Sequence, residues 1–440
     1  MIRRGFTLVE LLVALAIGGI LSVLVYGLFD TTSDSLFEVE NLSDANERMR
    51  FAMDQVRNDI QMAGAHASPD SEFDLWALPG ALTTYRVMGI TTFSGAQNRR
   101  DQLPTAPQDI EAANPDVSFD DFVVMGAYDY PISFEVAGLR AGADGLIRNN
   151  LRGLKRLYTV NPFGENLTAP DVTNPATVFG SMMDRRLLRV TDRQGKVQFA
   201  AVTGVSNAGA IGMNVTTDTD FIYKAGGQEF GLDVSFDGDV AYESAFIDIF
   251  RYHVEADPLD PSNMRLMRTR LCGETALTAF DTPSAVNLAA VEGLEDDCGD
   301  GTVQEVVIAD RVADFQVWFD CADPNTGAIE GSEFFSNWVD AVNEESPGIG
   351  GACMDVSGTY RPGRARRAHI RLSMYAPQER KDLRHYRFED ADGNIGDDAR
   401  DNGARLATFD PFPDIDGAAP VVTLQTSVEM TNHAYRNSRL

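Results

Sequence analysis

The residue most able to carry chemistry in this chain is Glu10, the one charged residue in an apolar run from position 6 to position 29. Two arginines precede the run, and Gly5 and Phe6 mark its start. A glutamate at the centre of a membrane-length helix costs about 2.5–3.5 kcal/mol on insertion scales. A simple membrane anchor has no use for such a residue, so Glu10 predicts a partner of opposite charge.

The apolar run is long enough to cross a bilayer, which takes about 20 helical residues. Because the arginines lie before the run, the positive-inside rule predicts a cytoplasmic N-terminus and places the chain after Asp30 on the other side of the membrane. Two plainer interpretations stay open. Ala14-Leu15-Ala16 resembles the cleavage site of a secretory signal peptide, and the run also fits an ordinary signal anchor.

The segment from Arg3 to Ala14 reads RRGFTLVELLVA and resembles the class III leader of type IV pilins and type II secretion pseudopilins. The resemblance implies that a prepilin peptidase cuts between Gly5 and Phe6 and that Phe6 becomes N-methylated. It also implies that Glu10 is the near-invariant glutamate of that family. The motif is long and ordered, which makes it a specific signal.

The resemblance gives Glu10 a physical role. Cleavage would create a positive amine on Phe6 inside a layer of low dielectric constant, where opposite charges attract strongly. The carboxylate of one subunit would neutralise the amine of its neighbour and so set the axial register between them. Gly18 and Gly19 would allow close helix approach in lipid, and Gly27 would loosen the helix locally.

The helix is expected to continue beyond the apolar run, through residues 30–65. Apolar residues spaced mostly by three and four positions predict one amphipathic face, and they are Leu36, Val39, Leu42, Met49, Met53, Val56, Ile60 and Ala63. Charged residues expected mainly on the other faces are Glu38, Glu47, Arg50, Asp54, Arg57 and Asp59. One helix of nearly sixty residues results, with a coiled-coil stalk as the alternative.

The composition fits an exported protein with a substantial core. The chain has 440 residues, 44% of them hydrophobic, and a net charge of −29 from 37 basic and 66 acidic residues. A surface this acidic argues against binding nucleic acid or anionic lipid by general electrostatic attraction. It favours solubility, divalent cations and basic partners.

Four cysteines lie in the last two fifths of the chain: Cys272, Cys298, Cys321 and Cys353. Outside the cytoplasm they are expected to form disulfides, for which three pairings exist. Sequence neighbours would pair as Cys272–Cys298 and Cys321–Cys353, each worth about 3–4 kcal/mol in the chain-entropy model. A zinc site is the alternative, but no CxxC pair or nearby histidine favours it.

The rest of the chain is predicted to be rich in β-strands. Strand patterns occur at 122–127, 132–136, 187–191, 197–202, 246–254, 264–271, 303–308, 315–319, 368–375 and 421–430. The expected fold class is therefore α+β: a long N-terminal helix, half membrane-spanning and half amphipathic, packed on an antiparallel sheet with large loop-rich β insertions. We divide the soluble part into a variable region at 66–240 and a cysteine-containing region at 241–440.

Residues 51–64 resemble the end of the long helix in the PilW family of minor pilins, and the later strands match that family in order but loosely. Ala65-His66-Ala67 stands where family members often carry an aromatic residue, a glycine and a cysteine. The resemblance implies an inner-membrane protein with a periplasmic globular domain, carried to the pilus tip on assembly. Its expected partners are prepilin peptidase, other minor pilins, the major pilin and a tip adhesin.

Two acidic loops are candidate Ca²⁺ sites, because this cation takes six to eight oxygen ligands. The first offers oxygens at Asp390, Asp392, Asn394 and Asp398. A second, sparser set comprises Asp320, Asp323, Asn325 and Glu330. A solvated acidic loop is the alternative for both, and no other cofactor is expected.

The sequence contains none of the usual enzyme motifs. The five histidines are scattered, and there is no HExxH, G-x-S-x-G, P-loop or dinucleotide fingerprint. The sequence therefore predicts a non-enzymatic minor pilin that helps to initiate pilus assembly. The alternatives are a J-type pseudopilin of type II secretion and a membrane-anchored periplasmic adhesin or enzyme that uses residues 66–240.

Overall fold

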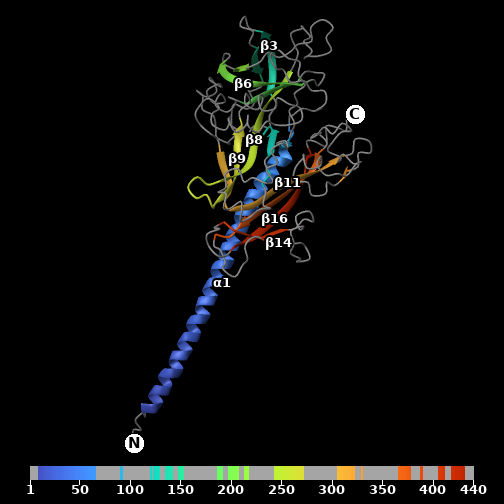
Figure 1. Ribbon diagram of the computed structural model, residues 1–440. Coiled ribbons are helices and arrows are strands. Elements are labelled where there is room, and N and C mark those ends of the chain that lie inside the picture. The colour runs from blue at the N-terminus through green and yellow to red at the C-terminus, as the bar shows by residue number, and fades with distance from the viewer. Residues whose placement is uncertain are drawn as a thin grey trace, which may run out of the picture.

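A long helix followed by two antiparallel sheets makes up the part of the chain that the computed structural model describes (Figure 1). The described residues are 8–65, 90–92, 119–120, 122–128, 134–141, 147–152, 186–191, 197–207, 213–217, 242–271, 305–322, 329–330, 365–377, 387–389, 405–411 and 418–431. This arrangement confirms the predicted α+β, pilin-like fold class.

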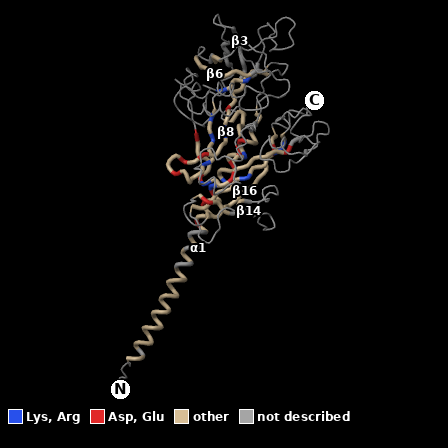
Figure 2. Tube along the Cα trace, viewed as in Figure 1, with Lys and Arg blue, Asp and Glu red and all other residues tan. Residues whose placement is uncertain are grey.

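Helix α1 runs without a break from Leu8 to Met62, 55 residues or about 80 Å at 1.5 Å per residue. It contains no proline, so nothing in its sequence interrupts the backbone hydrogen bonds. Its first half projects away from the strands (Figure 1) and carries almost no charge, whereas the charged residues gather on the sheets (Figure 2). The predicted single helix of nearly sixty residues is confirmed.

The second half of α1 is buried along one stripe, with Ala45, Met49, Ala52, Met53, Val56, Ile60 and Ala63 all below one tenth exposed. Two predictions about the stripe are wrong. Leu36 and Val39 are each 65% exposed, because the helix meets the strands only beyond them. Asp59, which we expected among the outward-facing charges, is buried at 5% exposure.

Two glycines fasten the end of α1 to strand β2 (Phe122–Gly126). Gly64 adopts a left-handed φ of 80°, which glycine accommodates without a steric penalty. Its N–H then donates to the carbonyl of Met125 at 2.8 Å. A Cβ on Gly126 would lie 2.8 Å from the main-chain oxygen of Met62, so only glycine allows this close approach.

The larger sheet has ten strands, centred on the long strand β8 (Tyr242–Ala256). The others are β1 (Ile90–Thr92), β2, β3 (Phe134–Ala141), β4 (Ile147–Arg152), β5 (Leu187–Thr191), β6 (Val197–Asn207), β7 (Met213–Thr217), β9 (Met264–Leu271) and β10 (Glu305–Ala309). β8 pairs with β3 and β5 in its first part and with β2 and β9 in its second. Because β3, β4, β7, β6 and β5 pair in succession, they close a six-stranded ring with β8.

The smaller sheet has six strands in the order β12-β11-β13-β16-β15-β14. Their bounds are β11 (Val312–Ala322), β12 (Ile329–Glu330), β13 (Ala365–Tyr375), β14 (Arg387–Glu389), β15 (Arg405–Phe409) and β16 (Ala419–Glu429). An isolated parallel bridge between Phe119 and Phe315 links the start of β2 to β11. The neighbouring Asp120 strengthens this link, since its carboxylate accepts a 2.7 Å hydrogen bond from the N–H of Val317.

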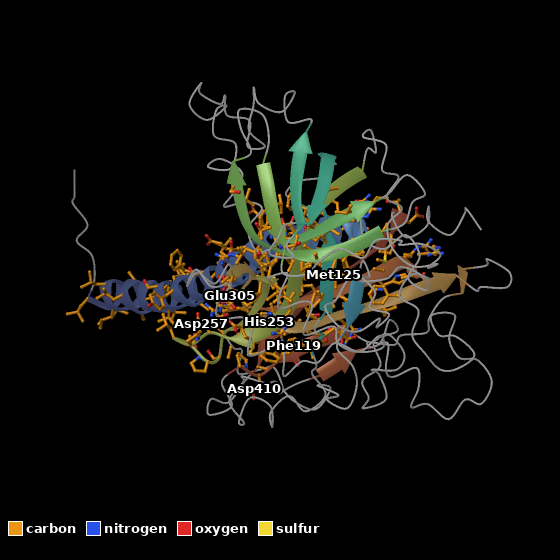
Figure 3. All side chains as sticks on the ribbon, turned by 90° about the horizontal axis from the view of Figure 1, so that it is seen from above. Phe119, Met125, His253, Asp257, Glu305 and Asp410 are labelled. Carbon is orange, nitrogen blue, oxygen red and sulfur yellow. The ribbon has the colours of Figure 1, made fainter. Side chains whose placement is uncertain are left out.

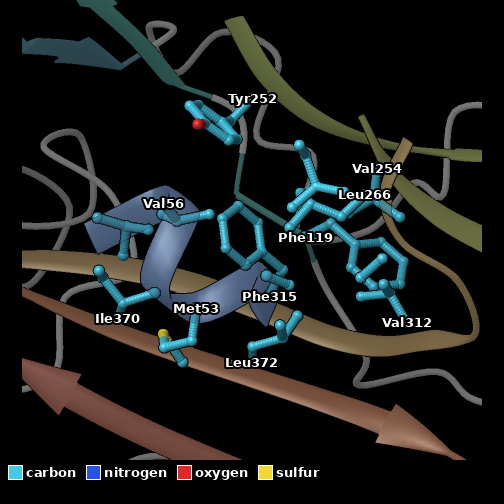
Figure 4. Close-up of a cluster of buried hydrophobic side chains, with 14 of the residues drawn as sticks. Met53, Val56, Phe119, Tyr252, Val254, Leu266, Val312, Phe315, Ile370 and Leu372 are labelled. Atoms are coloured by element: carbon cyan, nitrogen blue, oxygen red, sulfur yellow. The ribbon is translucent and has the colours of Figure 1, made fainter. Parts of the chain in front are cut away.

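The main core lies where α1 meets both sheets, as the close-up in Figure 4 shows. Met53 and Val56 of the helix pack with Phe315, Ile370 and Leu372 of the smaller sheet. Side chains of β2, β8 and β9 complete the cluster, and Figure 3 shows Phe119 labelled among the side chains that fill this region. Each element thus buries its apolar face against the other two.

The predicted strands are confirmed where they fall on described residues, and β5–β6 and β8–β9 pair as antiparallel hairpins. β2 and β3 follow each other along the chain, yet they do not pair with each other, since each pairs with β8. β2 is buried on both faces. Two sheets, not one, receive the helix, because the strands of the smaller sheet pair among themselves.

Candidate functional site

The N-terminal half of α1 is the surface that the sequence marks for function. Every side chain described from Leu8 to Phe29 is exposed, for example Val23 at 72% and Tyr26 at 74%. Within the described residues, one helix is long and apolar enough to cross a membrane: Leu11–Phe29 has a mean hydropathy of 2.5, and none of it is buried. About twenty exposed apolar residues in a row need lipid or other helices around them.

The predicted leader site lies at the very start of this surface. Gly5 and Phe6 fall outside the described residues, and Glu10 lies in the first turns of α1. Cleavage, N-methylation and the register role of Glu10 therefore stay predictions. The position of Glu10 is compatible with them, because a carboxylate near the helix start is within a few residues of a new N-terminal amine.

The small and polar residues of the apolar half suit close packing in lipid. Gly18, Gly19 and Gly27 each have open space where a Cβ would point. Ser22 donates through its hydroxyl to the carbonyl of Gly18 at 2.8 Å, so its polar group is satisfied inside the helix. The glycines thus leave shallow, apolar positions that another helix can approach closely.

A buried polar cluster fixes the other end of the helix. We call it the Asp59 cluster: Asp59, Tyr128, Tyr252 and Arg268. Tyr252 Oη donates to Asp59 Oδ2 at 2.6 Å, and Arg268 Nε donates to the same oxygen at 2.7 Å. Tyr128 Oη donates to the main-chain carbonyl of Asp59 at 2.9 Å. The cluster therefore ties the helix to β8, to β9 and to the residues after β2.

The charges of the Asp59 cluster reinforce one another. Burial raises the pKa of Tyr252 well above its ordinary value, and the Asp59 carboxylate raises it further, so Tyr252 remains a neutral donor. Burial lowers the pKa of Arg268, but Asp59 and Tyr252 outweigh that effect and leave this pKa raised. The guanidinium also lies 3.4 Å from the centre of the Phe250 ring, a favourable cation–π distance.

The sequence reasoning missed this cluster, although a signal for Asp59 was present. Asp59 lies three residues after Val56 and four before Ala63, which is the spacing of the buried face. A charge at that spacing indicates a buried partner. Nothing in the sequence marks Tyr252 and Arg268 as that partner, because they lie 193 and 209 residues further along the chain.

A second group of buried polar side chains lies on the smaller sheet, on strands β11 and β13. Arg371 donates through Nε to Asp314 at 2.9 Å and through Nη2 to Gln316 at 2.6 Å. Further along the same two strands, Asp320 of β11 lies 2.9 Å from Nε2 of His369 of β13. These pairs are cross-strand contacts that fix the register of β11 against β13.

The predicted cation and disulfide sites are largely outside the described residues. Asp390, Asp392, Asn394 and Asp398 lie there, as do Cys272, Cys298 and Cys353, whereas the backbone of Cys321 is part of β11. Of the second acidic set, Asp320 accepts one hydrogen bond from Arg367, at 3.5 Å, and lies 2.9 Å from His369 Nε2. The residues that the structure describes contain no group of three or more potential metal ligands.

Comparisons with known proteins found a family model and a similar protein. Residues 1–26 match the family model of the prokaryotic N-terminal methylation motif. A stretch of 65 residues is 45% identical to the pilin-like protein PilA3 of Thermus thermophilus, and it covers 14% of this chain and 27% of that protein. The chain thus spans about a quarter of the length of the curated relative that it matches. No solved structure matches.

The motif and the geometry agree. The motif lies at the very start of the chain. It opens a helix whose first half is apolar and exposed and whose second half is fastened to two antiparallel sheets. The narrower resemblance to the PilW family stays a prediction. The chain carries a type IV pilin-like N-terminal methylation motif on a membrane-length helix that continues into an α+β domain.

Proposed function

We propose that the protein is a minor pilin of a type IV pilus and part of the complex that primes assembly and remains at the tip. The observation that carries the proposal is the single helix α1, which joins an exposed apolar half to a half fixed in the domain core. A domain held rigidly on such a helix can be lifted from the membrane into a filament without losing its orientation.

Charge and shape favour a minor subunit at the tip over a repeated major one. Each chain carries a net charge of −29, so many identical copies in contact would repel one another. The strand ring that includes β3 and β6 lies beyond the end of α1, on the side away from the N-terminus (Figure 1). A bulky element in that position would obstruct a subunit above it, which is acceptable only at the end of a filament.

The mechanism is structural. Prepilin peptidase would cut after Gly5 and N-methylate Phe6 while the chain is anchored in the inner membrane with its domain in the periplasm. Glu10 would then neutralise the new amine of a neighbouring pilin and set the register of the two helices. Partners would be other minor pilins, the major pilin and a tip adhesin.

The leader is tested by mass spectrometry of the mature protein from the membrane fraction. We expect an N-terminus at N-methyl-Phe6. An intact Met1, or a start at Ile17, would overturn the pilin assignment.

The assembly role is tested in an in-frame deletion strain by counting surface pili with electron microscopy. Pili should be lost and should return with the wild-type gene. A Glu10→Ala variant should insert in the membrane but fail to restore pili, whereas the matched control Glu47→Ala, at an exposed position of the same helix, should restore them. Normal pili in the deletion strain would instead favour a type II secretion pseudopilin, with enzyme export as the next assay.

A further inference from the structure

The outer edge of β16 has a long stretch of backbone without a partner strand among the described residues. β16 pairs with β13 continuously from Val421 to Glu429, with no shift of register. On its other side it pairs with β15 only at Ala419 and Pro420. Among the described residues, β16 therefore has no second partner strand beyond Ala419 and Pro420.

Two backbone hydrogen bonds at the ends of the β13–β16 ladder fix which backbone groups point outward. The N–H of Ala376 donates to the carbonyl of Pro420 at 2.9 Å, and the N–H of Met430 donates to the carbonyl of Arg366 at 2.8 Å. Even-numbered residues of β16 therefore bond to β13, and odd-numbered residues direct their N–H and C=O groups away from it. The outward-facing residues beyond the β15 pairing are Thr423, Gln425, Ser427 and Glu429.

This edge lacks the features that normally prevent strands from associating. Such features are charged residues, prolines, bulges or very short strands. Residues 421–428 contain no charge and no proline, and the ladder to β13 has no bulge. The strands at the two ends of the sheet differ, since β12 has 2 residues and β14 has 3. Gln425 and Ser427 are exposed, so a partner strand can reach the edge.

We propose that residues 423–429 accept an extended segment of a different protein subunit, which adds a seventh strand to the smaller sheet. This inference rests on the proposed function, because the donor would be another subunit of the pilin assembly. Main-chain hydrogen bonds would supply affinity, and alternate side chains would supply specificity.

The faces of β16 define the chemistry of the donor. Val422 and Leu424 are half-buried against the core beside α1, so donor residues on that face should be apolar. Thr423, Gln425 and Ser427 lie on the opposite, polar face. Glu429 lies 4.0 Å from Arg367, but its side chain remains 77% exposed, so a basic donor residue can also contact it at that end of the edge. The donor is thus an alternating apolar and polar strand that is not acidic.

A second copy of this chain does not fit the edge. Two identical β16 edges pairing antiparallel would be related by a two-fold axis perpendicular to the sheet. Since α1 lies along this sheet, the same axis would point the two membrane helices in opposite directions, which two chains anchored in one membrane cannot adopt (Figure 1). Two chains of charge −29 would also repel each other.

A pair of proline substitutions in the full-length chain tests the proposal. Ser427→Pro removes an outward N–H and leaves the ladder to β13 intact, so the melting temperature should stay unchanged. Thr426→Pro is the matched control, because its N–H faces Ile370 of β13 and its loss should lower the melting temperature. We expect Ser427→Pro to be cleaved and anchored normally, yet to enter pili at about a tenth of the wild-type level or less.

Photocrosslinking in living cells gives a second readout, which does not depend on the stability of a proline variant. A photoreactive benzoylphenylalanine replaces Gln425 or Ser427 in an otherwise wild-type chain. We expect adducts to one other protein, mapped by mass spectrometry to donor residues two positions apart. The control is the same probe at Leu259, which is 94% exposed on the β8–β9 hairpin and should give no adducts to those donor residues.

The outcomes separate this inference from the proposed function. Wild-type incorporation of Ser427→Pro into pili, or no regular adducts from either probe position, would overturn strand addition and leave the pilin assignment in place. Adducts between two copies of this chain would overturn the choice of a different subunit. Absence of the wild-type chain from pili would refute the proposed function itself, and with it the donor class named here.

Discussion

Replacing Asp59 by alanine is the most informative single perturbation of this fold. Asp59 is the only point at which one carboxylate group joins α1 to both β8 and β9 among the described residues. Its removal would leave the hydroxyl of Tyr252 and the guanidinium of Arg268 buried without their shared acceptor. The helix would lose the contact that fixes its rotation relative to the larger sheet.

The cost can be worked out from the contacts. Removing one member of a buried ion pair costs about 3–5 kcal/mol, and the lower end applies because the Arg268 side chain keeps 18% exposure. A hydrogen bond to a charged group is worth about 1.5–3 kcal/mol, but Tyr252 and Arg268 share one oxygen, so the two losses overlap. We expect Asp59→Ala to lower the free energy of unfolding by about 3–4 kcal/mol.

The assay is urea unfolding of the full-length chain in detergent, followed by tryptophan fluorescence. Trp318 is a suitable reporter, since it is buried in β11 and stacks on His369 at 5.3 Å. The control is Asp54→Ala, an exposed aspartate of the same helix, which should change stability by less than about 0.5 kcal/mol.

Tyr252→Phe on its own should cost about 1–2 kcal/mol. Combined with Asp59→Ala it should add little, because the hydroxyl has already lost its acceptor. A change for Asp59→Ala no larger than that for Asp54→Ala would refute the view that this cluster holds the helix.

Three further predictions concern the same packing. Gly126→Ala should destabilise the domain by about 1–3 kcal/mol, because its Cβ would lie 2.8 Å from the Met62 carbonyl, whereas Gly204→Ala, which has open space, should not; urea midpoints compare them. Phe315→Ala should cost about 3–5 kcal/mol in the same titration, since this fully buried ring leaves a cavity. The raised pKa of Tyr252 means that the folded state favours the neutral phenol. The stability that the Tyr252 hydroxyl contributes is complete below the ordinary pKa of 10.0 and is lost as the pH rises above it. The melting temperature of Tyr252→Phe should therefore fall less steeply with rising alkaline pH than that of the wild type.

Several elements were predictable because their signals are local. The helix from Leu8 to Met62 follows from an apolar run joined to a stripe at spacings of three and four, without a proline. The β5–β6 and β8–β9 hairpins follow from short strand patterns on either side of turn residues. Neighbours within a few residues determine these elements, so the order of residues is sufficient to find them.

The limits of the buried stripe were not predictable in the same way. Leu36 and Val39 continue the apolar spacing, yet they are exposed, because no strand of the described part of the chain reaches them. Asp59 breaks the apolar pattern, yet it is buried, because Tyr252 and Arg268 are present to bind it. Spacing identifies a helix face, but only the position of distant strands decides whether that face is covered.

By itself the sequence determined the leader motif, the membrane-length helix with its one carboxylate, the acidic charge and the α+β class, since each depends on composition or on short-range periodicity. The tertiary structure decided that the described strands divide into two sheets, that β8 pairs with four others and closes a ring through β3 and β5, and that β16 has no second partner strand beyond Pro420 among the described residues. The physical reason is that a strand pattern specifies alternating faces, whereas its partners and its free edge depend on pairings between residues that are far apart in the chain.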